Sequence, residues 1–354
     1  QLGGVEAPDE LERRLALGLV HAHVERTLGA EAHAPRGVIE LNRAQAEIGD
    51  EQLRLIFIAC HPVLSREAQV ALTLRLLGGL DTAEIARAHL LPEATIAQRI
   101  VRAKKALHGQ AFELPGPAER AQRLDAVLAV VYLIFNEGHS AGRGAQLLRP
   151  DLCDEALRLA RQLQHLLPDE AEVQGLAALL EIQASRLPAR LDAQGRPVLL
   201  LEQDRRRWDR LLIQRGLAAL ARAQALGEPG PYTFQALIAA HHARAVRAED
   251  TDWAALLASY DQLLARHPSP VVALNRAIAL SHALGPAAAL PLLDALARDP
   301  ALRDYPFVAG AQADVLERLG RTAEAREAFL RAAALQHNEV QRALLLARAQ
   351  RLAD

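Results

Sequence analysis

The residues best suited to bind another molecule stand at helical spacing between Thr82 and Leu107. Each residue of an α-helix turns by about 100°, so a helix over 93–108 gathers hydrogen-bond donors and positive charge on one face. That face carries Thr95, Gln98, Arg99 and Arg102. Arg bonds guanine through two N–H groups, Gln bonds adenine, and Thr contacts a thymine methyl or a phosphate. The only two lysines, Lys104 and Lys105, follow near the helix end, where phosphate contact is expected.

A second face of the same helix is apolar and is expected to hold the helix against a core. Ile96, Ile100, Ala103 and Leu107 form one narrow apolar stripe that should face a core. A shorter helical pattern over 82–90 precedes it across Leu91-Pro92, with Asp81 and Glu84 at capping-box spacing. Two helices around a short turn predict a helix-turn-helix. Charged helix faces are usually only solvated, so periodicity alone leaves DNA binding and a plain surface about equally favoured.

Composition predicts the class of fold and limits the partners. Of 354 residues, 51% are hydrophobic but only 3% aromatic, so cores must be built from Leu, Ala, Val and Ile. Strong helix formers dominate and β-branched runs are scarce, which predicts an all-α protein. The net charge of −2 restricts any nucleic-acid surface to a local patch. Two cysteines do not make a disulfide scaffold, and no apolar run reaches the ~20 residues of a membrane span, so a cytoplasmic location is expected.

Pro, Gly and helical periodicity divide the chain into four parts. Residues 1–49 are expected to be a helical segment or connector, with helices near 9–30 and 38–48. Residues 50–110 carry four helical patterns, at 51–60, 66–78, 82–90 and 93–108. Pro115, Gly116 and Pro117 mark 111–118 as a linker. Residues 119–354 are again helical, with patterns at 121–135, 151–166, 169–185, 204–226 and 231–246 and a long loop at 186–203.

The C-terminal part contains an internal repeat. The segments 271–285 and 307–320 both end in Leu-Gly, and their glycines, Gly285 and Gly320, are 35 positions apart. Each is followed by a second helical pattern, at 286–298 and 322–335, and 252–267 resembles the second helix of an earlier pair. Helix pairs of this period resemble tetratricopeptide repeats, which stack into a superhelix. An ordinary helical bundle is the alternative.

These residues together resemble region four of bacterial RNA polymerase sigma factors, especially the extracytoplasmic-function group. The resemblance rests on Glu84-Ile85-Ala86, Pro92, Thr95-Ile96 and Arg99-Ile100-x-Arg102-Ala103-Lys104. Longer segments, "LRLIFIACHPVLSREAQVALTLRLLGGL" (53–80), "VVYLIFNEGHSAG" (130–142) and "DLCDEALRLARQL" (151–163), are similar to the subgroup with a C-terminal tetratricopeptide-like extension. Leu90 departs from the pattern where Gly is common, and Ala97 where Lys is frequent.

The resemblance implies a sigma factor that directs core RNA polymerase to promoter DNA. The helix-turn-helix would read the minus-35 element, and the C-terminal domain would regulate activity or bind a protein or peptide partner. Residues 1–49 are too short for the promoter-melting region two. Either the sequence is a fragment, which we favour, or the protein has lost this region. No catalytic, cofactor or metal motif is found, and an enzyme is not expected. The rival interpretation is a helical-repeat scaffold with a vestigial helix-turn-helix.

Other polar clusters carry weaker predictions. Asn136, Glu137 and His139, in "NEGHSAG", are the candidate for a regulatory loop, because the small residues around them favour a tight turn. A capped turn between two helices is the alternative. Cys60-His61 lacks the spaced partners of a zinc site. The run Arg205-Arg206-Arg207 is expected to be a solvated helix start.

Overall fold

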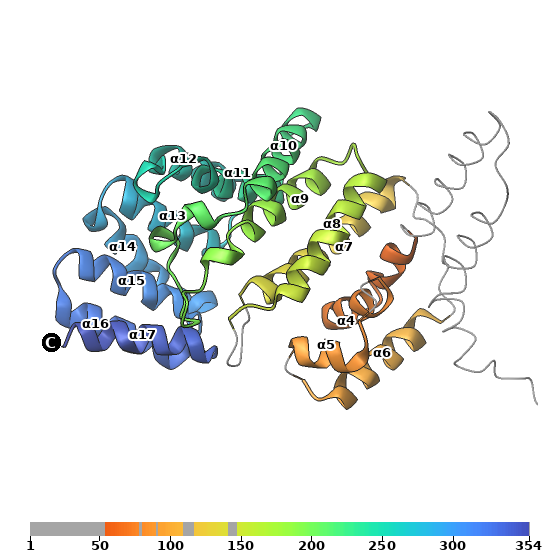
Figure 1. The fold of residues 1–354 in the computed structure, drawn as a ribbon, viewed down its shortest axis with the longest axis horizontal. Helices are drawn as coiled ribbons and strands as arrows, with labels where there is room; N and C mark the ends of the chain where they lie inside the picture. The colour runs from red at the N-terminus through yellow and green to blue at the C-terminus, as the bar shows by residue number, and fades with distance from the viewer. Residues whose placement is uncertain (1–53, 78–79, 90, 109–116, 141–146, 354) are drawn as a thin grey trace, which may run out of the picture. The chain divides into compact units, whose positions relative to one another are not determined.

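The protein is described here by a computed structural model, which places residues 54–77, 80–89, 91–108, 117–140 and 147–353 (Figure 1). Throughout these ranges the regular structure is helical, apart from one isolated antiparallel bridge between Leu191 and Pro197. The predicted all-α class is therefore confirmed. The predictions for residues 1–49 and for Leu90 lie outside the described residues. Contacts along the chain divide it into unit 1, Gln1–Ile134, and unit 2, Phe135–Asp354.

Unit 1 contains the predicted helix-turn-helix. Residues 54–59 are helical, followed by α4 (Arg66–Leu76), α5 (Thr82–His89) and α6 (Glu93–Leu107). The long helix α7 (Pro117–His139) begins in unit 1 and ends in unit 2. The side chains of Ile85 and Ile96 are fully buried, which fixes α5 against α6. The helices predicted at 66–78, 82–90 and 93–108 are thus confirmed.

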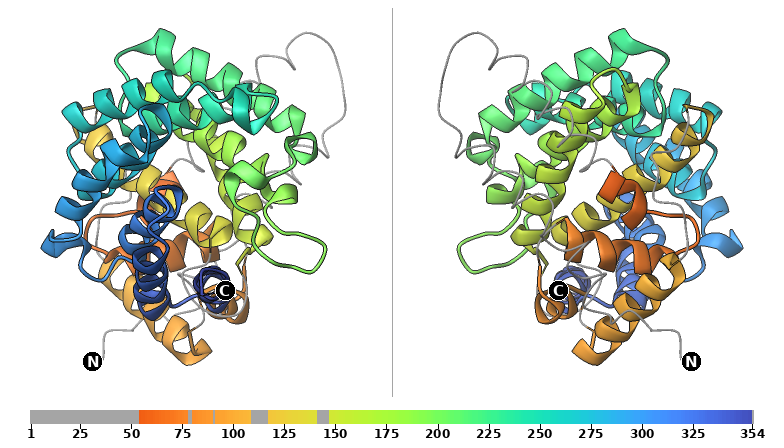
Figure 2. Two further views of the ribbon diagram at one scale, coloured as in Figure 1. Left: turned by 90° about the vertical axis from the view of Figure 1, so that its left-hand side faces the viewer. Right: turned by 90° about the vertical axis from the view of Figure 1, so that its right-hand side faces the viewer.

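Unit 2 continues with ten α-helices in the described chain, each packed on a neighbour in sequence. They are α8 (Pro150–Leu166), α9 (Ala171–Ala184), α10 (Arg210–Leu226), α11 (Pro231–Arg244), α12 (Trp253–Arg266), α13 (Pro270–Ala283), α14 (Pro286–Leu296), α15 (Pro306–Arg318), α16 (Thr322–Leu335) and α17 (Glu339–Arg351). Figures 1 and 2 show them following one another in chain order as a curved stack. No sequence pattern predicted α17 as a separate element.

The repeated glycines make the turns of two successive helix pairs. Gly285 has φ of 95° between α13 and α14, and Gly320 has φ of 73° between α15 and α16. An L-residue with a side chain pays a steric cost at such angles, so glycine is favoured. The sequence repeat therefore corresponds to two equivalent helix pairs. Assignment of these pairs to the tetratricopeptide class stays a prediction.

The helix predicted at 204–226 is wrong at its start. Residues Arg205–Arg207 form a short 3₁₀ turn, and α10 begins only at Arg210, where the Asp209 carboxylate accepts hydrogen bonds from the backbone N–H groups of Leu211 and Leu212. Arg205 is also not solvated, because its side chain is buried. It donates hydrogen bonds to the backbone oxygens of His242 and Ala245 and to Thr251 Oγ1.

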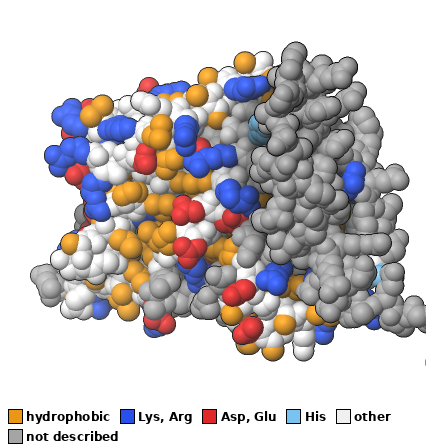
Figure 3. Space-filling model, turned by 45° about the vertical axis from the view of Figure 1, so that its right-hand side comes forward, with side chains coloured by type: hydrophobic (Ala, Val, Ile, Leu, Met, Phe, Trp, Pro, Cys, Tyr) orange, Lys and Arg blue, Asp and Glu red, His pale blue; other side chains and the backbone are white. Residues whose placement is uncertain are grey.

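Charged side chains are distributed rather than gathered on the face drawn in Figure 3. Lys and Arg are interspersed there with Asp, Glu and hydrophobic side chains. This agrees with a formal net charge of −2. None of the helices in the described ranges is long and apolar enough to cross a bilayer.

Candidate nucleic-acid interface

Helix α6 divides into a buried stripe and an accessible polar face, as the spacing predicts. Ile96, Ile100, Ala103 and Leu107 are at most 6% exposed. Thr95, Gln98 and Arg102 are exposed and Arg99 is half-buried. The apolar stripe therefore holds the helix on unit 1 while the polar face remains open.

The four polar side chains share one surface hollow. Thr95, Gln98, Arg99 and Arg102 line a depression of about 340 Å³. Its other wall is the turn at Val63 and Leu64, with Ser65 and Ala68 at the start of α4. The structure thus brings all four residues together and adds a second wall that the sequence analysis did not assign. The helix break at His61-Pro62, followed by a capping serine, was the available signal.

The second wall is the N-terminal end of α4. The Ser65 hydroxyl accepts a hydrogen bond from the Ala68 N–H at 3.3 Å. Helix N-termini carry partial positive charge and favour anions such as phosphate. Glu67 lies in this first turn, and hydrogen bonds from its own backbone N–H and then from Ser65 lower the pKa of its carboxyl, with a further contribution from the charge of Arg99. Glu67 therefore stays ionised and balances part of the positive charge.

Polar contacts hold the turn that forms this wall. The Gln69 side-chain amide donates to the backbone oxygens of Cys60 and His61 at 3.1 and 3.0 Å. Arg66 donates to the Ala126 oxygen on α7 at 3.1 Å. The Cys60 thiol lies 3.6 Å from the Thr73 hydroxyl, and burial raises its pKa to about 12. The Cys60 thiol is therefore protonated at pH 7 and packs in the core of unit 1.

The two lysines do not join the hollow. Lys104 is half-buried and lies about 180° around the helix from Thr95. Lys105 is exposed and lies about 80° from Thr95, on the side of Gln98. If α6 enters a groove with Thr95 forward, Lys105 is placed to contact phosphate and Lys104 points away.

The predicted regulatory loop is wrong in conformation. Asn136, Glu137 and His139 form the last turn of α7 rather than a loop. Gly138 allows this helix end to contact α8, since a Cβ there would lie 2.8 Å from Cys153 Sγ. Glu137 forms an ion pair with the Arg149 side chain. The backbone N–H of Arg149 donates a hydrogen bond to the backbone oxygen of Gly138 at 2.7 Å.

His139 is held in the same packed junction. Its ring stacks on Phe135 and lies 2.9 Å from Arg190 Nη1. Burial, followed by the charges of Arg190 and Arg186, keeps the pKa of His139 well below its usual value. The imidazole is therefore neutral at pH 7. These contacts pack the end of α7 against its neighbours. A regulatory role for Asn136, Glu137 and His139 stays a prediction.

No candidate metal site was found in the ranges that the structure describes. At no point there do three or more His, Cys, Asp or Glu side chains gather as metal ligands would. Cys153 is buried like Cys60, and burial raises the pKa of its thiol to about 12.

Comparison with known proteins adds two matched segments and one relative. Residues 54–107 match the family described as sigma-70, region 4. Residues 123–224 match a family of unknown function (DUF6596). The chain is also 48% identical, over 295 residues, to an uncharacterised protein of Rhizobium meliloti strain 1021, covering 83% of this chain and 69% of that protein.

Proposed function

We propose a function from one premise: the chain belongs to the same family as the Rhizobium meliloti protein, and its residues 54–107 are a sigma-70 region 4 domain. That domain points to a sigma-factor-like, DNA-binding role. The finer proposal is that the chain directs RNA polymerase to promoters and that α6 reads the minus-35 element. It works in the cytoplasm and has no catalytic role of its own.

The observation that supports this proposal most is the composition of the hollow beside α6. Gln98, Arg99 and Arg102 offer base-edge donors on one accessible face, and the stripe of Ile96 and Ile100 anchors the opposite face. The Ser65 hydroxyl and the Glu67 carboxylate already accept hydrogen bonds in the first turn of α4, so phosphate contact in this proposal rests on Lys105 at the end of α6. Base readout and backbone contact need this combination.

Under the same proposal, unit 2 regulates the DNA-binding unit. Its helix pairs offer a surface for a protein or peptide partner. The rival function is a scaffold with an inactive helix-turn-helix, which binds neither promoter DNA through α6 nor core RNA polymerase.

Fluorescence anisotropy with labelled promoter duplexes tests the proposal. Arg99→Ala should weaken binding to the preferred sequence by about 1–3 kcal/mol and reduce discrimination between bases. Lys105→Ala should weaken binding to all sequences and lower the slope of log K against log salt by about 1. Arg222→Ala, on the surface of unit 2, is the matched control and should change neither quantity.

Two outcomes would favour the scaffold instead. One is unchanged affinity, base preference and salt slope in both Arg99→Ala and Lys105→Ala. The other is failure of the full chain to bind purified core RNA polymerase. Lys104→Ala tests how α6 lies on the DNA. Because Lys104 points away from the Thr95 face, this variant should weaken DNA binding less than Lys105→Ala does.

A further inference from the structure

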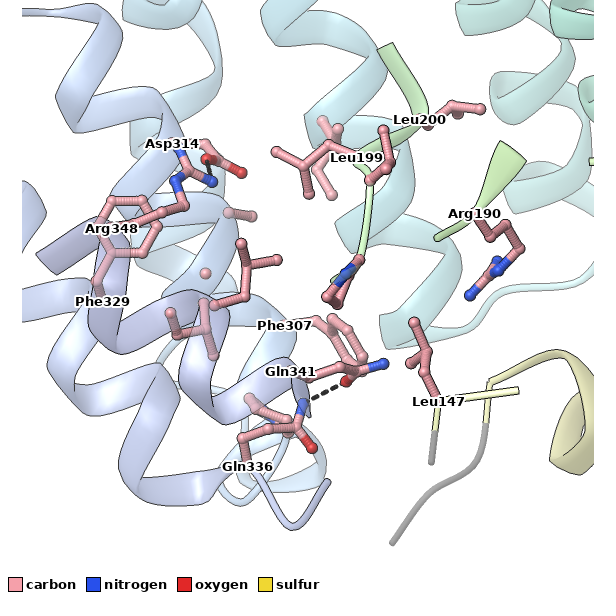
Figure 4. Close-up of a pocket in the computed structure, with 18 of the residues that line it drawn as sticks. Leu147, Arg190, Leu199, Leu200, Phe307, Asp314, Phe329, Gln336, Gln341 and Arg348 are labelled. Atoms are coloured by element: carbon pink, nitrogen blue, oxygen red, sulfur yellow. Dashed lines mark hydrogen bonds and ion pairs between the residues drawn. The ribbon is translucent and has the colours of Figure 1, made fainter. Parts of the chain in front are cut away.

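Unit 2 contains a cavity that the DNA-binding proposal does not use. Its volume is about 480 Å³, and the segment 186–203 supplies one wall while α13, α15 and α17 supply others (Figure 4). Much of the lining is apolar, including Leu199, Ile278, Phe307 and Leu345. Cavities of this size with a few polar groups are typical small-molecule sites.

One end of this cavity carries positive charge without a balancing carboxylate. Arg186 and Arg190 both line it. Arg186 donates to the Gln183 side chain at 2.7 Å and Arg190 contacts the His139 ring, while the Nε atom of each is buried without a hydrogen-bond partner. Among the described residues neither guanidinium forms an ion pair with Asp or Glu. Burial lowers the pKa of Arg186 to about 9, with Arg190 contributing repulsion, and that of Arg190 to about 10.

At the opposite end of the cavity the guanidinium is paired with carboxylates. Arg348 pairs with Asp314 at 2.5 Å and with Glu317 at 2.6 Å, and its guanidinium lies 4.2 Å from the centre of the Phe329 ring. Figure 4 shows this ion pair on the far side from Arg190, whose side chain extends toward Leu147. The uncompensated charge is therefore confined to the Arg186 and Arg190 end. Buried charges are costly until an anion pairs with them.

We propose that this cavity binds a small organic anion that has an apolar body and one carboxylate. The carboxylate lies at Arg190 and Arg186, since a guanidinium matches two carboxylate oxygens at once. The body lies along Phe307 and Leu199. Gly310 leaves room for it, because a Cβ added there would have no neighbour within 4 Å. This site stands whether or not residues 54–107 bind DNA.

Isothermal titration calorimetry on the full chain tests the charge requirement. The probes are octanoate, octan-1-ol and octylammonium, which share one chain length and differ in charge. Octanoate should bind at least about tenfold more tightly than the alcohol, since only the carboxylate accepts charge-assisted hydrogen bonds from two guanidinium groups. Octylammonium should not bind. Equal affinity for octanoate and octan-1-ol, or no heat with octanoate, would overturn the proposal.

Two variants test where the probe lies. Arg190→Gln should weaken octanoate binding about tenfold or more and leave the weak binding of octan-1-ol unchanged. Gly310→Leu fills the cavity from α15 and should abolish binding of both, while the helix should become no less stable because leucine is the better helix former. Arg222→Gln, outside the cavity, is the matched control.

Two outcomes separate this site from other occupants. Undiminished octanoate binding in Gly310→Leu, with the variant folded by circular dichroism, would place the probe elsewhere and refute the proposal. The last probe is a Leu-rich peptide with a free C-terminal carboxylate. If that peptide binds and octanoate does not, the cavity recognises a peptide end and the small-anion proposal is wrong.

Discussion

Helices α6 of unit 1 and α9 of unit 2 have similar lengths and opposite relations to the core. α6 buries four of its 15 residues in a single stripe, whereas α9 buries 11 of 14. Neighbours α8, α10 and α11 all pack on α9. A helix packed on one side keeps a face for recognition, while a helix packed all round can only support its neighbours. Helix α6 is therefore accessible to a partner, whereas α9 lies at the centre of the packing in unit 2.

Arginine follows the same division. Arg99 and Arg102 point into an open hollow in unit 1. In unit 2, Arg205 is 4% exposed and holds the end of α11 and the segment after it through three hydrogen bonds. The same residue type therefore lines an accessible surface in one unit and supports the interior of the other. Four changes, in order of expected effect, test this difference.

Arg205→Ala should cause the largest loss of stability. It removes the donors to two backbone oxygens and to Thr251, and would cost about 2–4 kcal/mol in the free energy of unfolding. Hydrogen-exchange mass spectrometry should show the loss in peptides of unit 2. The neighbouring Arg206→Ala is the control, since Arg206 is exposed and its ion pair among the described residues is with Asp204 in its own turn. Similar losses in both variants would contradict the supporting role of Arg205.

Gly175→Ala tests how closely α9 is packed. A Cβ at Gly175 would lie 2.3 Å from Thr233 Oγ1 and 2.8 Å from Thr233 N, so α11 must shift. The shift also disturbs the Glu172 carboxylate, which accepts hydrogen bonds from Thr233. Overpacking of this kind costs about 1–3 kcal/mol. Gly310→Ala is the matched helical glycine with open space, and thermal unfolding should show it unchanged or stabilised by about 0.4–1 kcal/mol.

Acidification should destabilise unit 2 through the half-buried imidazole of His242. Burial, followed by the charges of Arg186 and Arg205, lowers the pKa of His242 to about 3. His242 in the unfolded chain takes up a proton near pH 6.5, whereas His242 in the folded chain stays neutral until about pH 3. The free energy of unfolding is therefore highest above pH 6.5 and decreases as the pH falls toward 3. Between pH 7 and pH 5 the loss is about 1–2 kcal/mol for this residue.

His242→Gln should reduce that acid-dependent loss. The measurement is urea unfolding at pH 7 and pH 5, and only the difference between the two is compared. An identical pH dependence in wild type and His242→Gln would show that His242 is not responsible.

Ser65→Ala should have the smallest effect and should be confined to unit 1. It removes the side-chain cap of α4 and should cost about 1 kcal/mol. Faster hydrogen exchange should appear in α4 and not in α9. Ser65→Thr keeps the hydroxyl and serves as control. Equal protection in Ser65→Ala and wild type would mean that neighbouring contacts, such as those of Gln69, hold this turn by themselves.

Local sequence patterns predicted the helices well but did not predict the tertiary contacts of their ends. The two faces of α6 follow from a 100° turn per residue, which any short window of sequence reveals. The turns at Gly285 and Gly320 were marked by a repeated Leu-Gly. The "NEGH" segment was misjudged because glycine usually ends a helix, whereas Gly138 is needed for the contact with Cys153.

By itself the sequence determined that the chain is helical, where the helix-turn-helix lies and which four side chains share one face of α6. These properties depend on residues within a few turns of one another. Only the tertiary structure decided that the start of α4 completes the hollow, that Arg205 is buried, and that Arg186 and Arg190 line one cavity with Phe307. Packing brings together residues that are dozens of positions apart, and no local periodicity encodes such contacts.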